Sequence, residues 1–557
     1  MNKYILIIFL LNANLLLSQS NEGEIEDAQI LIEKNSNIIL PKVDKSIQKI
    51  DLENKNIDKK PFLFENISFT PILSNNKIDK ILRDNSYSED QKEIFVDLMG
   101  GNYSTFIVNT NPYYKSGNTF AIYSDLYIKL NSKGYKLSNV SGEEINDINV
   151  YADYKYSINS KISSHLNFSS YSNGYYGFIN TENITLTDNL IDNLRFSNNS
   201  FYYKIDWENI GKKYNSNVHY SGKIFSNSFF NESYHKISAN AILPSSNSLI
   251  NLYPEFETYE IRENIDDPLT DNKLTLSLFE LPLIYDFQSK NFSLRINASY
   301  QFLAKNFKSK STKHFFSPKI KLKYFNKNLT FKLSASRGYN YSRYSDEINL
   351  MPFIYQKGIT NQFDFNKELF RVKTNLDFNL FDNSILSLGF ESLKLEGNLE
   401  YTLYLGESLP TDIKIPMYLY TLERDGDVQI VNYFSFSYKT NISDNIESSF
   451  SVFHTVFEED QVFQPQFLID ILTSYSNNKY SLSLGANMEL ENYGLNFKNE
   501  LFKMKPFIDV YFNSSYSLSK NIDLNLKVYN ILNRYNERFF MYPELGTNFI
   551  VGVKWIF

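Results

Sequence analysis

The chain ends on the stretch Asn548-Phe549-Ile550-Val551-Gly552-Val553-Lys554-Trp555-Ile556-Phe557. Every second residue in it is apolar, namely Phe549, Val551, Val553, Trp555 and Phe557. Successive side chains of a β-strand point to opposite faces, so these five share one face. A strand with an unbroken apolar face that stops on an aromatic residue is typical of the last strand of a transmembrane β-barrel. One face lies against lipid and the other faces the lumen.

The same alternation recurs in the body of the chain, over residues 292–302, 329–336, 370–380 and 522–528. The second face of these stretches carries charged side chains such as Arg295, Lys332 and Asp377. A packed sandwich core would bury such charges at a high cost in free energy, whereas a lumen that contains water accepts them. We therefore predict an all-β fold, a transmembrane antiparallel β-barrel.

The spacing of these segments predicts the size of the barrel. From Phe95 onward a new segment begins about every 20 to 25 residues, which predicts roughly 18 to 22 strands, an even number if both ends are periplasmic. The short polar joints at 326–328 and 382–383 are predicted to be periplasmic turns. The long joints at 175–193, 339–366 and 406–426 are predicted to be external loops, where ligand contacts would concentrate.

Composition agrees with this class of protein. Aromatic residues make up 16% of the chain, with 42 Tyr and 46 Phe but only 2 Trp. A barrel uses such residues in the girdles at the two membrane interfaces, where the ring lies among acyl chains and the hydroxyl meets water. The formal net charge of -7 argues against a nucleic-acid partner. Beyond the N-terminal leader no apolar run approaches the length of a membrane helix.

The N-terminus has the pattern of an export signal. Lys3 precedes a mostly apolar stretch from Ile5 to Leu17, and a plausible cleavage site precedes Gln19. We expect a signal peptide at 1–18, a periplasmic arm at 19–91 and the barrel at 92–557. The chain contains no cysteine, which excludes a lipid-modified cysteine at the signal boundary and any disulfide.

The arm at 19–91 differs in composition from the barrel. It contains Pro41, Pro61 and Pro71 and many charged residues, so we expect an extended segment without a core of its own. One hypothesis is that the arm offers a short strand to the sheet edge of a protein partner in the periplasm or outer membrane. The residues of that strand would be Gln29, Ile30, Leu31, Ile32 and Glu33. The alternative is a solvated leader or a strand inside the lumen.

The C-terminal region resembles the closing hairpin of TonB-dependent outer-membrane receptors. In that family an N-[LI]-x-N-[KR] element ends the penultimate strand, a Y-P-x-x-G turn follows, and the last strand ends in an aromatic residue. The matching residues are Asn530, Asn533, Arg534, Tyr542, Pro543, Gly546, Gly552 and Phe557. The chain differs at Thr547, where the family usually has arginine, and its arm is shorter than the plug domain of those receptors.

The resemblance implies a location in the outer membrane of a Gram-negative bacterium, surrounded by outer-membrane lipids. It also implies that the barrel-assembly machinery reads the terminal strand and its aromatic end. Because Val553 lies on the predicted lipid face, we expect a charge there to be damaging. A charge at Ile550 or Lys554, on the other face, is expected to be better tolerated.

Nothing in the sequence indicates an enzyme or a cofactor. The five histidines, none of which lies in a nucleophile motif, are expected at interfaces or in loops: His165, His219, His235, His314 and His454. Two acidic sets could hold a divalent cation in an external loop. They are Glu458, Glu459 and Asp460 beyond His454, and Glu263, Asp266 and Asp267 before Pro268. The alternative, which we favour, is a solvated loop, so we predict no metal site.

Two classes of function remain open. In the first, the barrel is a transporter or channel for an unidentified solute. In the second, it is a non-transporting interaction subunit of an outer-membrane complex, with the lumen filled by loops or by the arm. Resemblance at the level of the fold does not separate the two classes.

Overall fold

The computed structural model describes residues 94–557, apart from 118, 132–140, 158, 175–193, 211–214, 245–247, 265–272, 308, 351, 355–363, 382, 398, 406–417, 425–426, 497 and 499. The predicted signal peptide, the arm and the proposed strand Gln29 to Glu33 lie outside these residues, as does the predicted loop 175–193. Among the described residues, no helix is long and apolar enough to cross a membrane.

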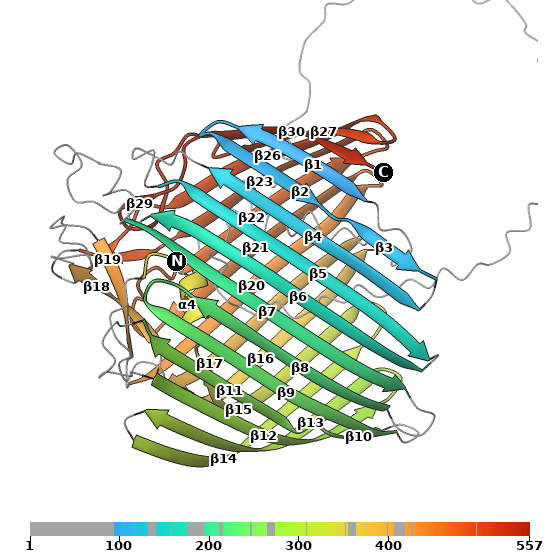
Figure 1. Cartoon of the computed structure of the whole chain (residues 1–557), viewed down its shortest axis with the longest axis vertical. Coiled ribbons are helices and arrows are strands. Elements are labelled where there is room, and N and C mark those ends of the chain that lie inside the picture. The colour runs from blue at the N-terminus through green and yellow to red at the C-terminus, as the bar shows by residue number, and fades with distance from the viewer. Residues whose placement is uncertain are drawn as a thin grey trace, which may run out of the picture. The chain divides into compact units, whose positions relative to one another are not determined.

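The described strands form one large sheet that closes on itself (Figure 1). It contains 24 strand segments, and all of its strand pairings are antiparallel. Closure comes from the first strand, β1 (Phe95–Gly101), which pairs with both β2 (Thr105–Thr110) and the last strand, β30 (Asn548–Ile556). The register places Phe95 opposite Ile556 and Gly101 opposite Ile550.

Two barrel positions are each filled by two segments, so the 24 segments occupy 22 positions. β2 and β3 (Tyr113–Ser116) both pair with β4 (Phe120–Asn131), and Pro112 lies between them. β10 (Ser248–Leu252) and β11 (Glu255–Glu263) both pair with β9 and β12, and Pro254 lies between them. Proline cannot donate a ladder hydrogen bond, which explains both interruptions. The 22 positions are an even number at the upper end of the predicted range.

The other barrel strands follow in chain order. They are β5 (Glu143–Ser157), β6 (Ser160–Gly174), β7 (Arg195–Ile210), β8 (Asn215–Ser226), β9 (Phe230–Pro244), β12 (Lys273–Gln288), β13 (Phe292–Phe307), β14 (Ser309–Phe325), β15 (Leu329–Tyr341), β16 (Phe365–Phe381), β17 (Ser384–Glu396), β20 (Val428–Ser443), β21 (Ile446–Phe457), β22 (Phe467–Ser476), β23 (Tyr480–Leu490), β26 (Phe507–Ser519) and β27 (Ile522–Tyr529).

The two ends of the barrel differ. At one end the joints are short, such as residues 326–328 between β14 and β15, where Asn326 Oδ1 accepts hydrogen bonds from the amides of Asn328 and Leu329. The other end carries the long joints, which contain further elements. These are the helix α4 (Tyr344–Leu350) and the hairpins β18 (Leu399–Leu405) with β19 (Tyr418–Arg424), β24 (Tyr493–Leu495) with β25 (Leu501–Lys503), and β28 (Glu537–Phe539) with β29 (Tyr542–Pro543).

The boundaries predicted for two long loops need correction. β15 continues through Tyr341 and β16 begins at Phe365, so the predicted loop 339–366 is too long at both ends. The predicted loop 406–426 contains the strand Tyr418–Arg424, which pairs with β18. The ends of the first loop continue the ladder of β15 and β16, whereas Tyr418–Arg424 forms a separate two-stranded sheet with β18.

The outer face of the barrel is an apolar belt. Along β14, Phe316 is 59% exposed and Ile320 is 47% exposed, whereas Ser317, on the other face, is buried. A belt of exposed apolar side chains on a closed barrel is the lipid-facing surface of an outer-membrane protein. The structure therefore confirms the predicted all-β transmembrane barrel.

The main buried cluster lies at the long-loop end. Its members come from the strand ends at that side and from the loops above them, including Phe230 of β9, Tyr259 of β11 and Phe353 of the joint between β15 and β16. The loops thus pack on one another and on the inner wall. Their shared core positions the candidate site.

Candidate functional site at the mouth of the barrel

An inward-folded loop is the central feature of the long-loop end. It is made of Ser342–Leu350 and 352–354, which we call the α4 loop. Tyr344 and Ser345 of the helix and Ile354 beyond it are all 0% exposed. Figure 1 shows α4 enclosed by the barrel strands on the side of the loops. The loop packs against the inner faces of β8, β9 and β11, and so lies inside the mouth of the barrel.

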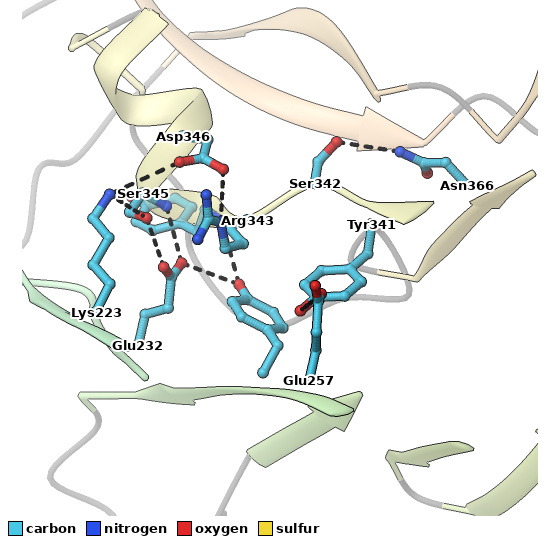
Figure 2. A network of polar contacts seen from close by, with 11 residues as sticks. Lys223, Glu232, Glu257, Tyr341, Ser342, Arg343, Ser345, Asp346 and Asn366 are labelled. Carbon is cyan, nitrogen blue, oxygen red and sulfur yellow. Dashed lines mark hydrogen bonds and ion pairs between the residues drawn. The ribbon is translucent and has the colours of Figure 1, made fainter. Parts of the chain in front are cut away.

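A buried carboxylate fastens this loop to the wall (Figure 2). Glu232 of β9 accepts hydrogen bonds from the amide of Ser345 at 2.9 Å, from Ser345 Oγ at 2.6 Å and from the hydroxyl of Tyr259 at 3.2 Å. The Tyr259 hydroxyl in turn accepts a hydrogen bond from the amide of Tyr344 at 3.3 Å. One wall carboxylate therefore satisfies the first turn of α4, both directly and through Tyr259.

Charged groups of the loop flank this contact. Figure 2 shows Asp346 between Lys223 and Arg343. Arg343 Nε lies 2.7 Å from Asp346 Oδ2, and Lys223 Nζ of β8 donates to Ser345 Oγ at 3.0 Å. Burial disfavours the charge on Arg343, but the Asp346 carboxylate outweighs this effect and raises the pKa of Arg343 above its ordinary value. Burial likewise raises the pKa of the Tyr344 phenol, which stays neutral.

Aromatic contacts carry the loop across the mouth. The ring of Tyr344 meets Phe230 edge to face at 4.7 Å, on the wall formed by β8 to β11. On its other side Phe353 stacks on Tyr542 of β29, with ring centroids 3.8 Å apart, and meets Phe539 of β28 at 5.8 Å. The α4 loop thus links one wall of the barrel to the joint between β27 and β30.

That joint, residues 530–547, contains the residues that match the family-like closing hairpin. Asn530 has a φ of 47° and Asn533 a φ of 49°, a conformation that asparagine tolerates better than most residues. The Asn530 side-chain amide donates to the carbonyls of Arg534 and Leu545, and its oxygen accepts from the Arg534 amide. Thr547, which stands where the family has arginine, donates from Oγ1 to the Asn530 carbonyl. Asn530 therefore organises both ends of the joint.

The two glycines of the hairpin lie at close approaches. A Cβ at Gly546 would come within 2.8 Å of Asn533 Oδ1, and a Cβ at Gly552 within 2.2 Å of the Met99 side chain. Tyr542 is buried beneath Phe353, and Pro543 follows it in β29. A side chain at either glycine would therefore clash with its neighbours.

A buried ion pair attaches the joint to the neighbouring strands. Arg538 of β28 places Nε 2.8 Å from Glu489 Oε1 of β23 and its guanidinium 4.4 Å from the ring of Phe507 of β26. Burial disfavours the charge, but the Glu489 and Glu544 carboxylates raise the pKa of Arg538 above its ordinary value. No motif or spacing in the sequence marks Arg538, Glu489 or Glu232, because their partners lie on distant segments of the chain.

A polar cavity of about 160 Å³ lies below this joint. Its lining includes Lys129, which pairs with Glu143 at 2.5 Å, and Asp509, which accepts a hydrogen bond from the Asn530 amide. Asn548 also lines it, with a buried side-chain oxygen that has no hydrogen-bond partner among the described residues. The cavity suits a few water molecules or a small polar group.

The predicted lipid-facing residues of the last strand all point outward. Phe549, Val551, Val553, Trp555 and Phe557 are 47–66% exposed. On the other face Ile550 is only 3% exposed and packs with Met99 and Ile107, so it is not a site where a charge would be tolerated. Lys554 is therefore the inner-face position with which a charge at Val553 can be compared. The role of these residues as an assembly signal stays a prediction.

The histidines lie in strands, not in loops: β6, β8, β9, β14 and β21 carry one each. His454 stacks on Phe467 with ring centroids 4.1 Å apart, and His219 lies 2.5 Å from Asp206. Within the described residues, no group of three or more His, Asp or Glu side chains could hold a metal ion. Asp266 and Asp267 fall outside those residues.

Comparison with solved structures finds similar barrels in several other proteins. The FrpB iron transporter from Neisseria meningitidis matches with a TM-score of 0.64 at 9% identity, over 84% of this chain and 82% of that one. The siderophore receptor PiuA from Acinetobacter baumannii matches with 0.61 at 10% identity, over 85% and 82%. The ferric-catecholate import receptor Fiu from E. coli K12 matches with 0.59 at 10% identity, over 84% and 82%.

The chain has the same barrel fold as these three proteins. This confirms the fold predicted from the closing residues of the chain. At 9% to 10% identity the likeness shows the fold alone. No protein-family model and no curated protein matches the sequence.

Proposed function

We propose that the chain is an outer-membrane transporter that takes up a solute through its barrel. The observation that carries this proposal is the closed barrel of 22 positions, the size at which outer-membrane barrels act as transporters with a filled lumen. The similar structures described as iron transporters and siderophore receptors support the same role. They make a ferric chelate the first solute to test, and none of these three is described as an enzyme.

The α4 loop supports a controlled rather than an open passage. It crosses the mouth by contacts with Glu232 on one side and Tyr542 on the other. A solute that arrives from outside would meet this loop and the joint 530–547 before it reaches the lumen. Movement of the loop would break a small set of hydrogen bonds and ring contacts and leave the strand ladders intact.

The test is uptake of radioactive iron by iron-limited cells that produce the chain, compared with cells that do not, with and without a protonophore. Higher uptake that the protonophore abolishes supports energised import, and higher uptake that it leaves unchanged supports diffusion. If uptake is unchanged, permeation of other solutes into proteoliposomes decides between a different solute and no transport. No permeation at all would contradict the proposal and favour the interaction subunit.

We also propose that the arm at 19–91 lies in the periplasm and binds a protein partner there, through a strand at Gln29 to Glu33. The support is its composition, with prolines and many charges. Deleting 19–91 should remove a co-purifying partner and change conductance little. A large rise in conductance with the partner retained would show instead that the arm fills the lumen.

A further inference from the structure

Strand β14 presents a row of lysines to the lumen. Ile320 and Tyr324 are 47% and 38% exposed on the lipid side, so the odd-numbered residues between and beside them face inward. These are Lys319, Lys321 and Lys323, all of them exposed to the lumen. Alternate residues of a strand lie about 7 Å apart, so the three form a continuous basic stripe, which we call the lysine stripe. It lies in the half of β14 nearer the short-turn end.

The three lysines have no acidic partner. Within the described part of the chain, no carboxylate lies within ion-pair distance of them, and Lys323 has only a ring contact, with Phe325 at 5.1 Å. Other cations of the same wall are paired. Arg295 of β13 holds Asp286 at 2.5 Å and 2.9 Å, and Lys332 of β15 holds Asp377 at 3.2 Å.

The register makes the arrangement unfavourable for the barrel itself. Lys321 lies directly opposite Arg295, and Lys323 lies directly opposite Lys332. Like charges opposite each other across antiparallel strands destabilise the pair. Among the described residues, this wall therefore carries a positive excess that neighbouring carboxylates do not neutralise.

The strands β4 to β7 carry inward side chains of both signs, among them Lys129, Lys161 and Lys204. The inner faces of β4 to β7, which lie far from β14 in the order of the ring, carry Asp125, Asp147, Asp153 and Asp206. Two of these pair with lysines, Asp153 with Lys161 and Asp206 with Lys204. The unpaired lysines of β14 would draw a negative solute toward their own wall of the lumen.

We propose that the lysine stripe is a contact surface for an anionic solute in the lumen, one that carries carboxylate, phosphate or similar oxyanion groups. The inference rests on the proposed transport function and names the charge class of its solute. Rows of Lys or Arg select anions in membrane pores. Lysine acts as a flexible point charge, which suits a solute that moves past the stripe rather than one held in a fixed geometry.

The absence of cysteine in the chain allows a direct test. Ser334 of β15 lies directly opposite Lys321, so the variant Ser334→Cys places a thiol beside the stripe. Its reaction rates with an anionic and with a cationic methanethiosulfonate reagent are compared in the full chain. We expect the anionic reagent to react roughly tenfold faster, because local charge raises the encounter rate of opposite charges. High salt should reduce this preference.

Two comparisons make the result specific. The triple change Lys319→Gln, Lys321→Gln and Lys323→Gln in the Ser334→Cys chain should abolish the preference for the anionic reagent. Ser451→Cys of β21, directly opposite Asp470, is the matched control and should prefer the cationic reagent. If both thiols show the same preference, the stripe has no local effect and the proposal is wrong.

Other outcomes also count against it. A thiol at Ser334 that reacts with neither reagent would mean that solutes do not reach the stripe. If deletion of 19–91 is needed before the anionic reagent reacts, the stripe holds an acidic segment of the chain rather than a solute. The iron-uptake experiment tests the proposed transport function independently of the lysine stripe. Uptake without charge preference would overturn only this inference, and charge preference without iron uptake would leave another anion as the solute.

Discussion

Ser345 on α4 donates a 2.6 Å hydrogen bond to the carboxylate of Glu232 on β9, from a position 113 residues further along the chain. Both residues are buried, with exposures of 0% and 2%. A loop that the sequence places outside the membrane is thus fastened to the inner wall of the barrel. The strength of this contact sets how easily the mouth can open.

Removing the carboxylate should release the loop. Glu232→Ala leaves the amide and hydroxyl of Ser345 and the hydroxyl of Tyr259 without their acceptor, at about 1 to 3 kcal/mol for each group that stays buried. We expect faster exchange of the Ser345 amide proton and faster protease cleavage within the α4 loop. Glu232→Gln, which keeps one acceptor oxygen, should have an intermediate effect.

The control for that experiment is Glu447→Ala. Glu447 forms an exposed pair with Lys439, with side-chain exposures of 49% and 46%, and such pairs contribute about 0 to 1 kcal/mol. Glu447→Ala should therefore change neither the exchange of the Ser345 amide proton nor protease cleavage within the α4 loop. Equal exchange rates in the Glu232→Ala and original proteins would show that the remaining contacts, which include Lys223 and the aromatic rings, hold the loop without Glu232.

Asn530 allows the backbone and side-chain contributions to be separated. Asn530→Gly keeps the left-handed backbone conformation at φ 47° and loses the side-chain hydrogen bonds, whereas Asn530→Ala loses the bonds and adds strain. We expect a loss in the free energy of unfolding on the order of 2 kcal/mol for glycine and about 1 kcal/mol more for alanine. Denaturant titration of the refolded barrel measures both, and equal losses would mean that φ is not limiting.

Two adjacent residues of the last strand should differ in how much an arginine there destabilises the barrel. Val553 is 47% exposed on the lipid face, so Val553→Arg should cost about 2 to 4 kcal/mol if it lies near the membrane midplane. Lys554→Arg keeps the charge on the inner face, near the ring of Phe95, and should cost little. Equal losses in the two refolded variants would mean that the strand does not separate lipid from lumen.

Deletion of Phe557 should impair insertion more than stability. Its side chain is 66% exposed and stacks on Trp555, and its amide donates to the carbonyl of Ile94 at 2.8 Å. Few stabilising contacts are lost, so the refolded protein should unfold much like the full chain. In cells we expect the truncated chain to stay in the periplasm, which fractionation measures. Normal insertion of the truncated chain would remove the proposed role as an assembly signal.

The fold could be predicted from the sequence because each barrel strand shows its own alternation of apolar and polar residues. The alternation around Phe549 and Val551, or around Phe370 and Arg371, reflects one side chain in lipid and the next in water. That period depends only on neighbouring residues. Class, approximate strand number and the short-turn end therefore followed from the chain.

The mouth could not be predicted in the same way. Glu232 and Ser345, or Phe353 and Tyr542, meet only after the barrel has closed, and no spacing rule joins positions so far apart. Ile550 shows the same limit on a small scale. Its phase in β30 predicts an inward side chain, but only the structure shows that Met99 and Ile107 cover it.

The pairing of β1 with β30 has a consequence for how the molecule is made. The first ladder partner of Phe95 is Ile556, so the ring cannot close until almost the last residue has been exported. Every earlier intermediate has two unpaired strand edges, which invite aggregation, and pairing across such a long sequence separation is slow. We therefore expect the unclosed chain to need a chaperone in the periplasm. A chain that lacks β30 would keep the pairing of β1 with β2 but leave the other edge of β1 unpaired.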